Sequence, residues 1–223
     1  GYKKYMVKNQ PQNLNSGVND EIRISESITA STESVYLIIS NQKKVAEILS
    51  LEDLKEEDII DAFNALHVVL EVSLNTLFRH ISLLSIKKGI GRLDIIKNID
   101  SISFISKMIL FIYNSKFNFI DVESATAYHK IIGTIKDFSS IRNQLLHGHS
   151  ISTIVDEHGT YHSGLKQTLN KETLKNQVKK YLFILEGMRF YLNCLESPLT
   201  SSGKENLIKT YLNDSFIPDS YKS

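Results

Sequence analysis

Apolar side chains recur three and four residues apart over most of the chain. The longest such stretch starts at Asp58 and contains Ile59, Phe63, Leu66, Leu70, Leu74, Leu77, Ile81 and Leu84. This spacing places the apolar side chains on one face of an α-helix. It predicts a long amphipathic helix that ends near Lys87-Lys88-Gly89.

The same pattern predicts further helices before and after this one. They lie within 33–57, in 101–114, after Asp121, and from an Asn170 cap to about Glu196. Gly133 and the stretch Phe138-Ser139-Ser140 leave open whether the helix after Asp121 runs on through Arg142 or is kinked or broken before it.

Residues 151–169 interrupt the helical pattern. Short β-prone runs on either side of Glu157-His158-Gly159 predict a small β-hairpin or flap. Several helices with no periodic repeat indicate an all-α fold, an up-and-down helical bundle. We expect four segments: an N-terminal arm (1–32), a preceding helix (33–57), the bundle (58–197) and a C-terminal tail (198–223). In the tail we expect a short helix over 204–213 and a loose end.

Composition narrows the class of protein. The chain has 223 residues, 42% hydrophobic and 23% charged, as in an ordinary globular protein. A net charge of +1 means that any nucleic-acid binding must come from a local basic patch. Cys194 is the single cysteine, so we expect no internal disulfide and a reducing, cytoplasmic setting. No apolar run is long enough for a membrane span, so we expect no membrane partner.

The stretch from Arg142 to Gly148 carries the most chemistry. Arg142 is a permanent cation, Asn143 follows it directly, and His147 shares a helical face with Asn143 because the two are four residues apart. Gly148 suits the position just past a helix end, so we expect His147 in the last turn, where the helix dipole favours its protonated ring. An arginine beside a titratable imidazole is suited to handling a phosphate group.

The long helix also carries a second, polar stripe at helical spacing. Its members are Asn64, His67, Glu71, Asn75 and Arg79. One interpretation is the solvent face of a surface helix. The neighbouring turn is apolar, however, and a polar ridge on a mostly buried helix needs partners. In that case Glu71 would orient Arg142 or His147, and Asn75 would bind a phosphate.

Arg142-Asn143-x-x-x-His147 resembles the motif of the HEPN superfamily, in which an arginine and a polar residue precede a histidine by a short spacer. The resemblance covers roughly 58–196 and implies a HEPN-like helical bundle. It also implies a metal-independent endoribonuclease without cofactor, in which Arg142 contacts the scissile phosphate of RNA and His147 is the general acid or base. Asn143 would position the ring or a phosphate oxygen. HEPN ribonucleases share their site across a homodimer and leave a cyclic phosphate.

The resemblance further implies a toxin or anti-phage defence role, with an antitoxin or a defence-system partner, and it selects Glu71 or Asn75 as the polar residue that faces the motif. One subfamily, paired with a nucleotidyltransferase antitoxin, has tyrosine two residues after the motif histidine. His149 stands there in this chain, which argues against control by tyrosine modification. His149 would either take part in proton transfer or lie on a solvent-facing loop.

Two other interpretations remain open. The first is a non-catalytic HEPN module that binds RNA, a nucleotide or a protein partner. The second is structural, with Arg142 and His147 neutralising buried carboxylates such as Glu71 or Asp137. A metal site at His158 and His162 is disfavoured, because no cysteine or carboxylate cluster completes it.

Overall fold

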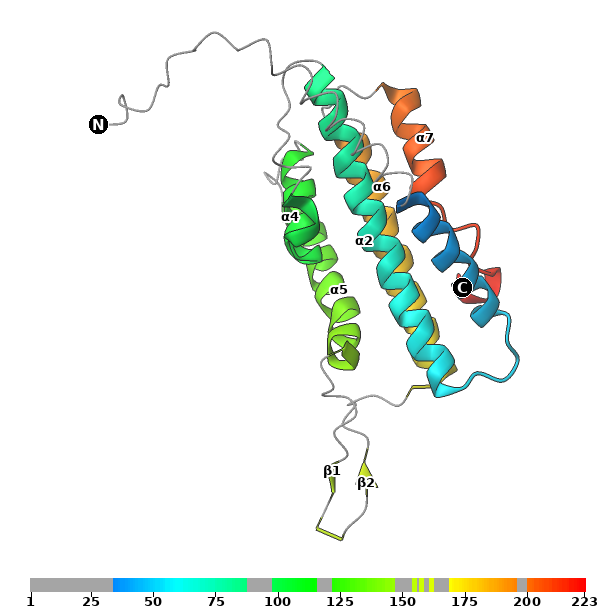
Figure 1. Cartoon of the computed structure of the whole chain (residues 1–223). Coiled ribbons are helices and arrows are strands. Elements are labelled where there is room, and N and C mark those ends of the chain that lie inside the picture. The colour runs from blue at the N-terminus through cyan, green and yellow to red at the C-terminus, as the bar shows by residue number, and fades with distance from the viewer. Residues whose placement is uncertain are drawn as a thin grey trace.

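The structure, a computed structural model, describes residues 34–87, 98–115, 122–146, 154–155, 157–158, 161–162, 169–195 and 200–223. These parts form an all-α bundle with one small hairpin (Figure 1). A first helix covers residues 34–49. The later helices are α2 (Glu56–Lys87), α4 (Phe104–Asn114), α5 (Val122–Leu146), α6 (Lys171–Cys194) and α7 (Ser201–Tyr211). Two short 3-10 helices are η2 (Ile99–Ser101) and η3 (Asp219–Tyr221).

The longest helices are α2, α5 and α6. The predicted long amphipathic helix is confirmed as α2. The open question at Gly133 is settled, because α5 runs without a break to Leu146. At the start of α6, the Asn170 side chain accepts a hydrogen bond from the backbone N–H of Thr173 at 2.9 Å. The Thr173 hydroxyl in turn accepts one from the Asn170 N–H at 2.8 Å. This capping box fixes the first turn of α6.

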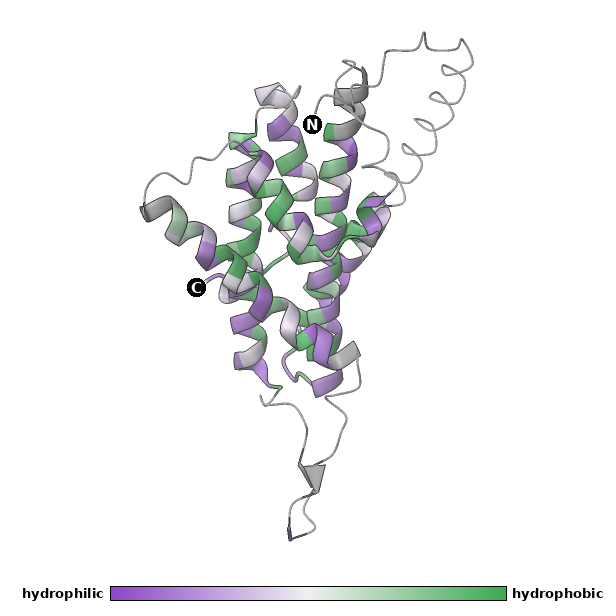
Figure 2. Ribbon diagram, turned by 90° about the vertical axis from the view of Figure 1, so that its left-hand side faces the viewer, coloured by the Kyte–Doolittle hydropathy of each residue, from purple (hydrophilic) through white to green (hydrophobic). Residues whose placement is uncertain are grey.

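The core lies between α2, α5 and α6, and α4 packs on α2 and α5 (Figure 1). Phe63 and Leu70 of α2 are fully buried in it, together with Phe138 of α5. α5 and α6 approach so closely that a Cβ on Gly187 would overlap the side chain of Ile131. Figure 2 shows polar and apolar residues interspersed along the helices. Among the described residues, no helix is long and apolar enough to cross a membrane.

The expectation of a loose C-terminal end is wrong. Leu212, Ile217 and Tyr221 are all buried in the core. The chain is tied down there by polar contacts as well, since Arg189 Nε donates a hydrogen bond to the backbone oxygen of Leu212 at 2.7 Å. The helix in this region also starts earlier than expected, at Ser201. The tail therefore completes the core.

The hairpin consists of β1 (Ile154–Val155) and β2 (Tyr161–His162), paired antiparallel. Ile154 is opposite His162, and Val155 is opposite Tyr161. Figure 1 shows the hairpin beyond the end of the bundle at which α5 ends and α6 begins. It therefore lies at the same end of the molecule as the Arg142 motif.

Candidate functional site

The polar stripe on α2 points into the protein. His67 keeps 2% of its surface exposed, and Asn75 and Arg79 keep 8% each. The solvent-face interpretation is therefore wrong for these three residues. Polar groups at such positions must find partners inside the protein, because an unpaired buried polar group is costly.

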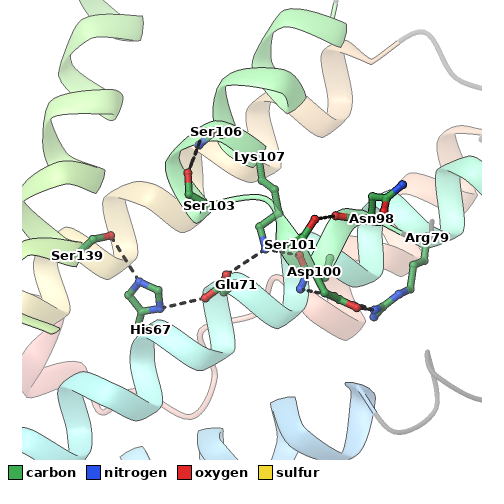
Figure 3. Close-up of polar contacts among 11 residues, drawn as sticks. His67, Glu71, Arg79, Asn98, Asp100, Ser101, Ser103, Ser106, Lys107 and Ser139 are labelled. Atoms are coloured by element: carbon green, nitrogen blue, oxygen red, sulfur yellow. Dashed lines mark hydrogen bonds and ion pairs between the residues drawn. The ribbon is translucent and has the colours of Figure 1, made fainter. Parts of the chain in front are cut away.

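The partner of Glu71 and Asn75 is Lys107 of α4. Its side chain is fully buried, and its Nζ donates to Glu71 Oε1 at 3.0 Å and to Asn75 Oδ1 at 2.8 Å (Figure 3). An ammonium group can be buried at acceptable cost only when it is paired in this way. Sequence reasoning missed Lys107, although a single lysine in an apolar helix was a signal for it.

The other half of the stripe is paired with Asp100 of η2. Arg79 Nη2 donates to both carboxylate oxygens of Asp100, at 2.9 and 2.7 Å. Asn75 Nδ2 donates to Asp100 Oδ1 at 3.1 Å, so both the oxygen and the nitrogen of the Asn75 amide are hydrogen-bonded. Arg79 Nη1 also donates to Ser34 Oγ at 3.1 Å, which extends the network to the first helix. Asn75 therefore has a structural role in the network.

His67 lies where α2, α4 and α5 meet. Its ring stacks on Phe138 at a centroid distance of 5.8 Å and is tilted against Phe104 at 5.4 Å. His67 Nε2 is 3.5 Å from Ser139 Oγ, and Nδ1 is 3.6 Å from Glu71 Oε2 (Figure 3). Burial, and then the positive charge of Arg142, lower the pKa of His67 from 6.5 to about 4, although Glu71 acts in the opposite direction. The ring is therefore neutral at neutral pH.

Arg142 lies near this network without being paired in it. It follows Ser139 by three residues on α5, so the two share a helical face. The side chain is half-buried, and it makes no hydrogen bond or ion pair with any residue that the structure describes. Glu71 is instead held by Lys107, and Asp137 is exposed. Neither of the two acids that the structural interpretation names is therefore paired with Arg142.

The remaining predicted site residues divide into two groups. Asn143 is described and exposed on α5, next to Arg142. His147 and His149 lie outside the described residues, and α5 is described as far as Leu146, directly before His147. The position of His147 in the last helical turn stays a prediction.

The arrangement is suited to binding an anion. A half-buried guanidinium that has no described acidic partner can bind a phosphate through paired hydrogen bonds. Within the described ranges, no group of three or more His, Cys, Asp or Glu side chains is placed to hold a metal ion. No family model, no characterised protein and no solved structure matches this chain.

Proposed function

We propose that this chain is a metal-independent endoribonuclease of the HEPN type. The observation that carries the proposal is the guanidinium of Arg142, which pairs with no residue that the structure describes, beside a network whose described acids are already paired. An enzyme that cleaves RNA needs a cation of this kind on the scissile phosphate, where negative charge increases in the transition state. The sequence supplies an imidazole five residues later, at His147.

The reaction requires two proton transfers. A base removes the proton of the ribose 2′-hydroxyl, whose oxygen attacks the neighbouring phosphorus and forms a 2′,3′-cyclic phosphate. An acid donates a proton to the 5′-oxygen as its bond to phosphorus breaks. His147 performs one of these transfers, and His147 of the partner subunit performs the other in a homodimer with a shared site. Asn143, exposed beside Arg142, positions the ring or a phosphate oxygen.

The surroundings of the site have subsidiary roles in this proposal. The β1–β2 hairpin acts as a flap that covers bound RNA, and His149 adds a second imidazole. Glu71 serves through the buried network, since its carboxylate is held by Lys107. The biological setting is a cytoplasmic toxin or anti-phage defence system, with an antitoxin or defence-system partner.

The test is cleavage of total RNA in the presence of a metal chelator. We expect wild type to cleave, and Arg142→Ala or His147→Ala to lose at least about 100-fold in rate, the usual size of an acid–base contribution. His129→Ala is the matched control, because it removes an exposed imidazole from the same helix α5. Cleaved ends should carry a cyclic phosphate, which mass spectrometry detects.

The assay also separates the alternative function. Arg142 would serve equally well in a non-catalytic module that binds RNA or a nucleotide through phosphate. Wild type that binds RNA without cutting it, and loses binding in Arg142→Ala, would establish that alternative. Cleavage at the wild-type rate by His147→Ala would refute the enzymatic proposal.

A further inference from the structure

Three charged side chains surround the neutral ring of His67. Glu71 comes from α2, Lys107 from α4 and Arg142 from α5. Lys107 pairs with Glu71, and Arg142 follows Ser139 by three residues on α5, where Ser139 Oγ is 3.5 Å from the ring. Both cations lower the pKa of His67. Glu71 Oε2 is 3.6 Å from the same ring. Of the two cations in this group, Lys107 is the one that pairs with Glu71.

Glu71 pairs with Lys107, the cation that is buried and that no ligand can reach. Lys107 is fully buried, and its ammonium contacts Glu71 Oε1 at 3.0 Å and Asn75 Oδ1 at 2.8 Å. Arg142 is half-buried and is the cation with access to solvent. Because the Lys107–Glu71 pair is neutral as a unit, Arg142 is the member of this group of three whose charge is not balanced within it.

A lysine is an expensive choice at position 107. The other buried residues of α4 are apolar: Phe104, Met108, Phe111 and Ile112. A methionine or leucine would fill the same kind of position without the cost of removing an ammonium from water. An apolar residue would also leave Glu71 without its cation, and Arg142 is the other cation that lowers the pKa of His67. A carboxylate and a guanidinium so placed pair readily, because arginine is long and its fork matches a carboxylate.

We propose that Lys107 is a positioning residue, which holds Glu71 so that Arg142 stays available to a phosphate group of the ligand. The inference rests on the proposed phosphate-binding role of Arg142. It assigns to the buried network a task in binding, because the network keeps Glu71 away from the arginine. Lys107 acts through Glu71 and touches no substrate.

The test is a binding measurement with a fluorescent oligodeoxynucleotide, which cannot be cleaved because it lacks the 2′-hydroxyl. Fluorescence anisotropy at low salt gives the Kd. We expect Arg142→Ala to raise the Kd about tenfold, the effect of losing one good charge contact. Lys107→Met should raise it to a similar extent, since the freed Glu71 neutralises Arg142. Adding Glu71→Gln to Lys107→Met should restore the Kd to within about twofold of wild type.

A matched control separates this mechanism from a general change in charge. Lys107→Met/Glu57→Gln has the same net charge as the rescued variant, but it removes an exposed acid from the first turn of α2. It should bind as weakly as Lys107→Met alone. Lys107→Gln, which keeps a hydrogen-bond donor for Asn75 without the charge, gives a second and milder background for the same rescue. Circular dichroism establishes that each variant is folded.

The outcomes are decisive in both directions. Weak binding by a folded Lys107 variant, restored by Glu71→Gln and not by Glu57→Gln, supports the inference. Wild-type binding by the Lys107 variants, or no rescue by Glu71→Gln, overturns it. Binding by Arg142→Ala that is as tight as that of wild type also overturns the inference. Rescue in a protein that never cleaves RNA supports the role of Lys107 and refutes the enzymatic function, whereas cleavage without any effect of Lys107 refutes the inference alone.

Discussion

The buried imidazole of His67 makes the stability of this protein depend on pH. In the folded state the pKa of His67 is lowered to about 4, first by burial and then by Arg142. In the unfolded chain the ring returns to its ordinary pKa of 6.5. Between these two values the unfolded state binds a proton that the folded state does not. The stability contributed by the neutral ring is therefore fully present above the pKa of the unfolded state. It is lost as the pH is lowered toward the pKa of the folded state.

The size of the effect follows from the two protonation equilibria. Each pKa unit of difference corresponds to about 1.4 kcal/mol, so the total loss is about 3 kcal/mol once both states are protonated. At about pH 5 the loss relative to about pH 7 is about 2 kcal/mol. The groups around His67 explain why its pKa is lowered. Phe104 and Phe138 exclude water from the ring, and the positive charges of Lys107 and Arg142 oppose its protonation. Glu71 and a backbone hydrogen bond of His67 act in the opposite direction and favour protonation.

Urea denaturation at about pH 7 and about pH 5 measures this loss, with His67→Gln as the test variant, since an amide is neutral at both pH values. We expect wild type to lose about 2 kcal/mol more than His67→Gln on acidification, whatever the variant costs at neutral pH. Burial also lowers the pKa of His80, but that group is present in both proteins and cancels in the difference.

His129→Gln provides the control, because it removes an imidazole that is exposed on α5. It should show the same acid loss as wild type. If wild type and His67→Gln lose the same free energy of unfolding between the two pH values, then His67 does not hold its ring neutral in the folded state. The account of the network around it would then be wrong.

Three further predictions concern the packing of the bundle, each measured as a free energy of unfolding in urea. Gly187→Ala should be less stable than Gly133→Ala by about 1–3 kcal/mol. Both substitutions raise helix propensity, but only the new methyl group at position 187 meets the side chain of Ile131. Equal stabilities would contradict the close approach of α5 and α6. Ending the chain after Tyr211 removes three buried apolar side chains and should cost more than about 4 kcal/mol; a stable truncated protein would show that the tail is dispensable. Asn170→Ala should cost about 1 kcal/mol through the lost cap of α6, and no loss would contradict the capping box.

The helices were largely predictable, because periodic apolar positions mark both their course and their buried face. The continuity of α5 was not. Gly133 and Ser139-Ser140 are local signals for a break, yet Ile135 and Phe138 between them are fully buried. Packing of the apolar face against α6 and α2 outweighs the weak helix propensity of glycine and serine. Tertiary contacts of this kind do not appear in a local pattern.

The prediction of a loose C-terminal end was wrong for a related reason. Its apolar residues are too widely spaced to give a helical period, so the sequence alone suggested a loose end. In the structure Leu212, Ile217 and Tyr221 each enter the core singly, from a segment that is mostly not helical. Periodicity detects regular elements, and it misses irregular chain that is held by individual buried side chains.

The polar stripe could be seen in the sequence, but the partners of its charged side chains could not. Helical spacing left open whether Glu71 and Asn75 face the solvent or the interior, and the motif at Arg142 was the only interior partner that the sequence suggested for them. The actual partner, Lys107, comes from a different helix, thirty-six residues from Glu71. A single sequence gives no information on such a pairing. In the proposed function this pairing gives Glu71 the opposite of the expected role: Glu71 does not orient Arg142, and its pairing with Lys107 leaves Arg142 available to a phosphate.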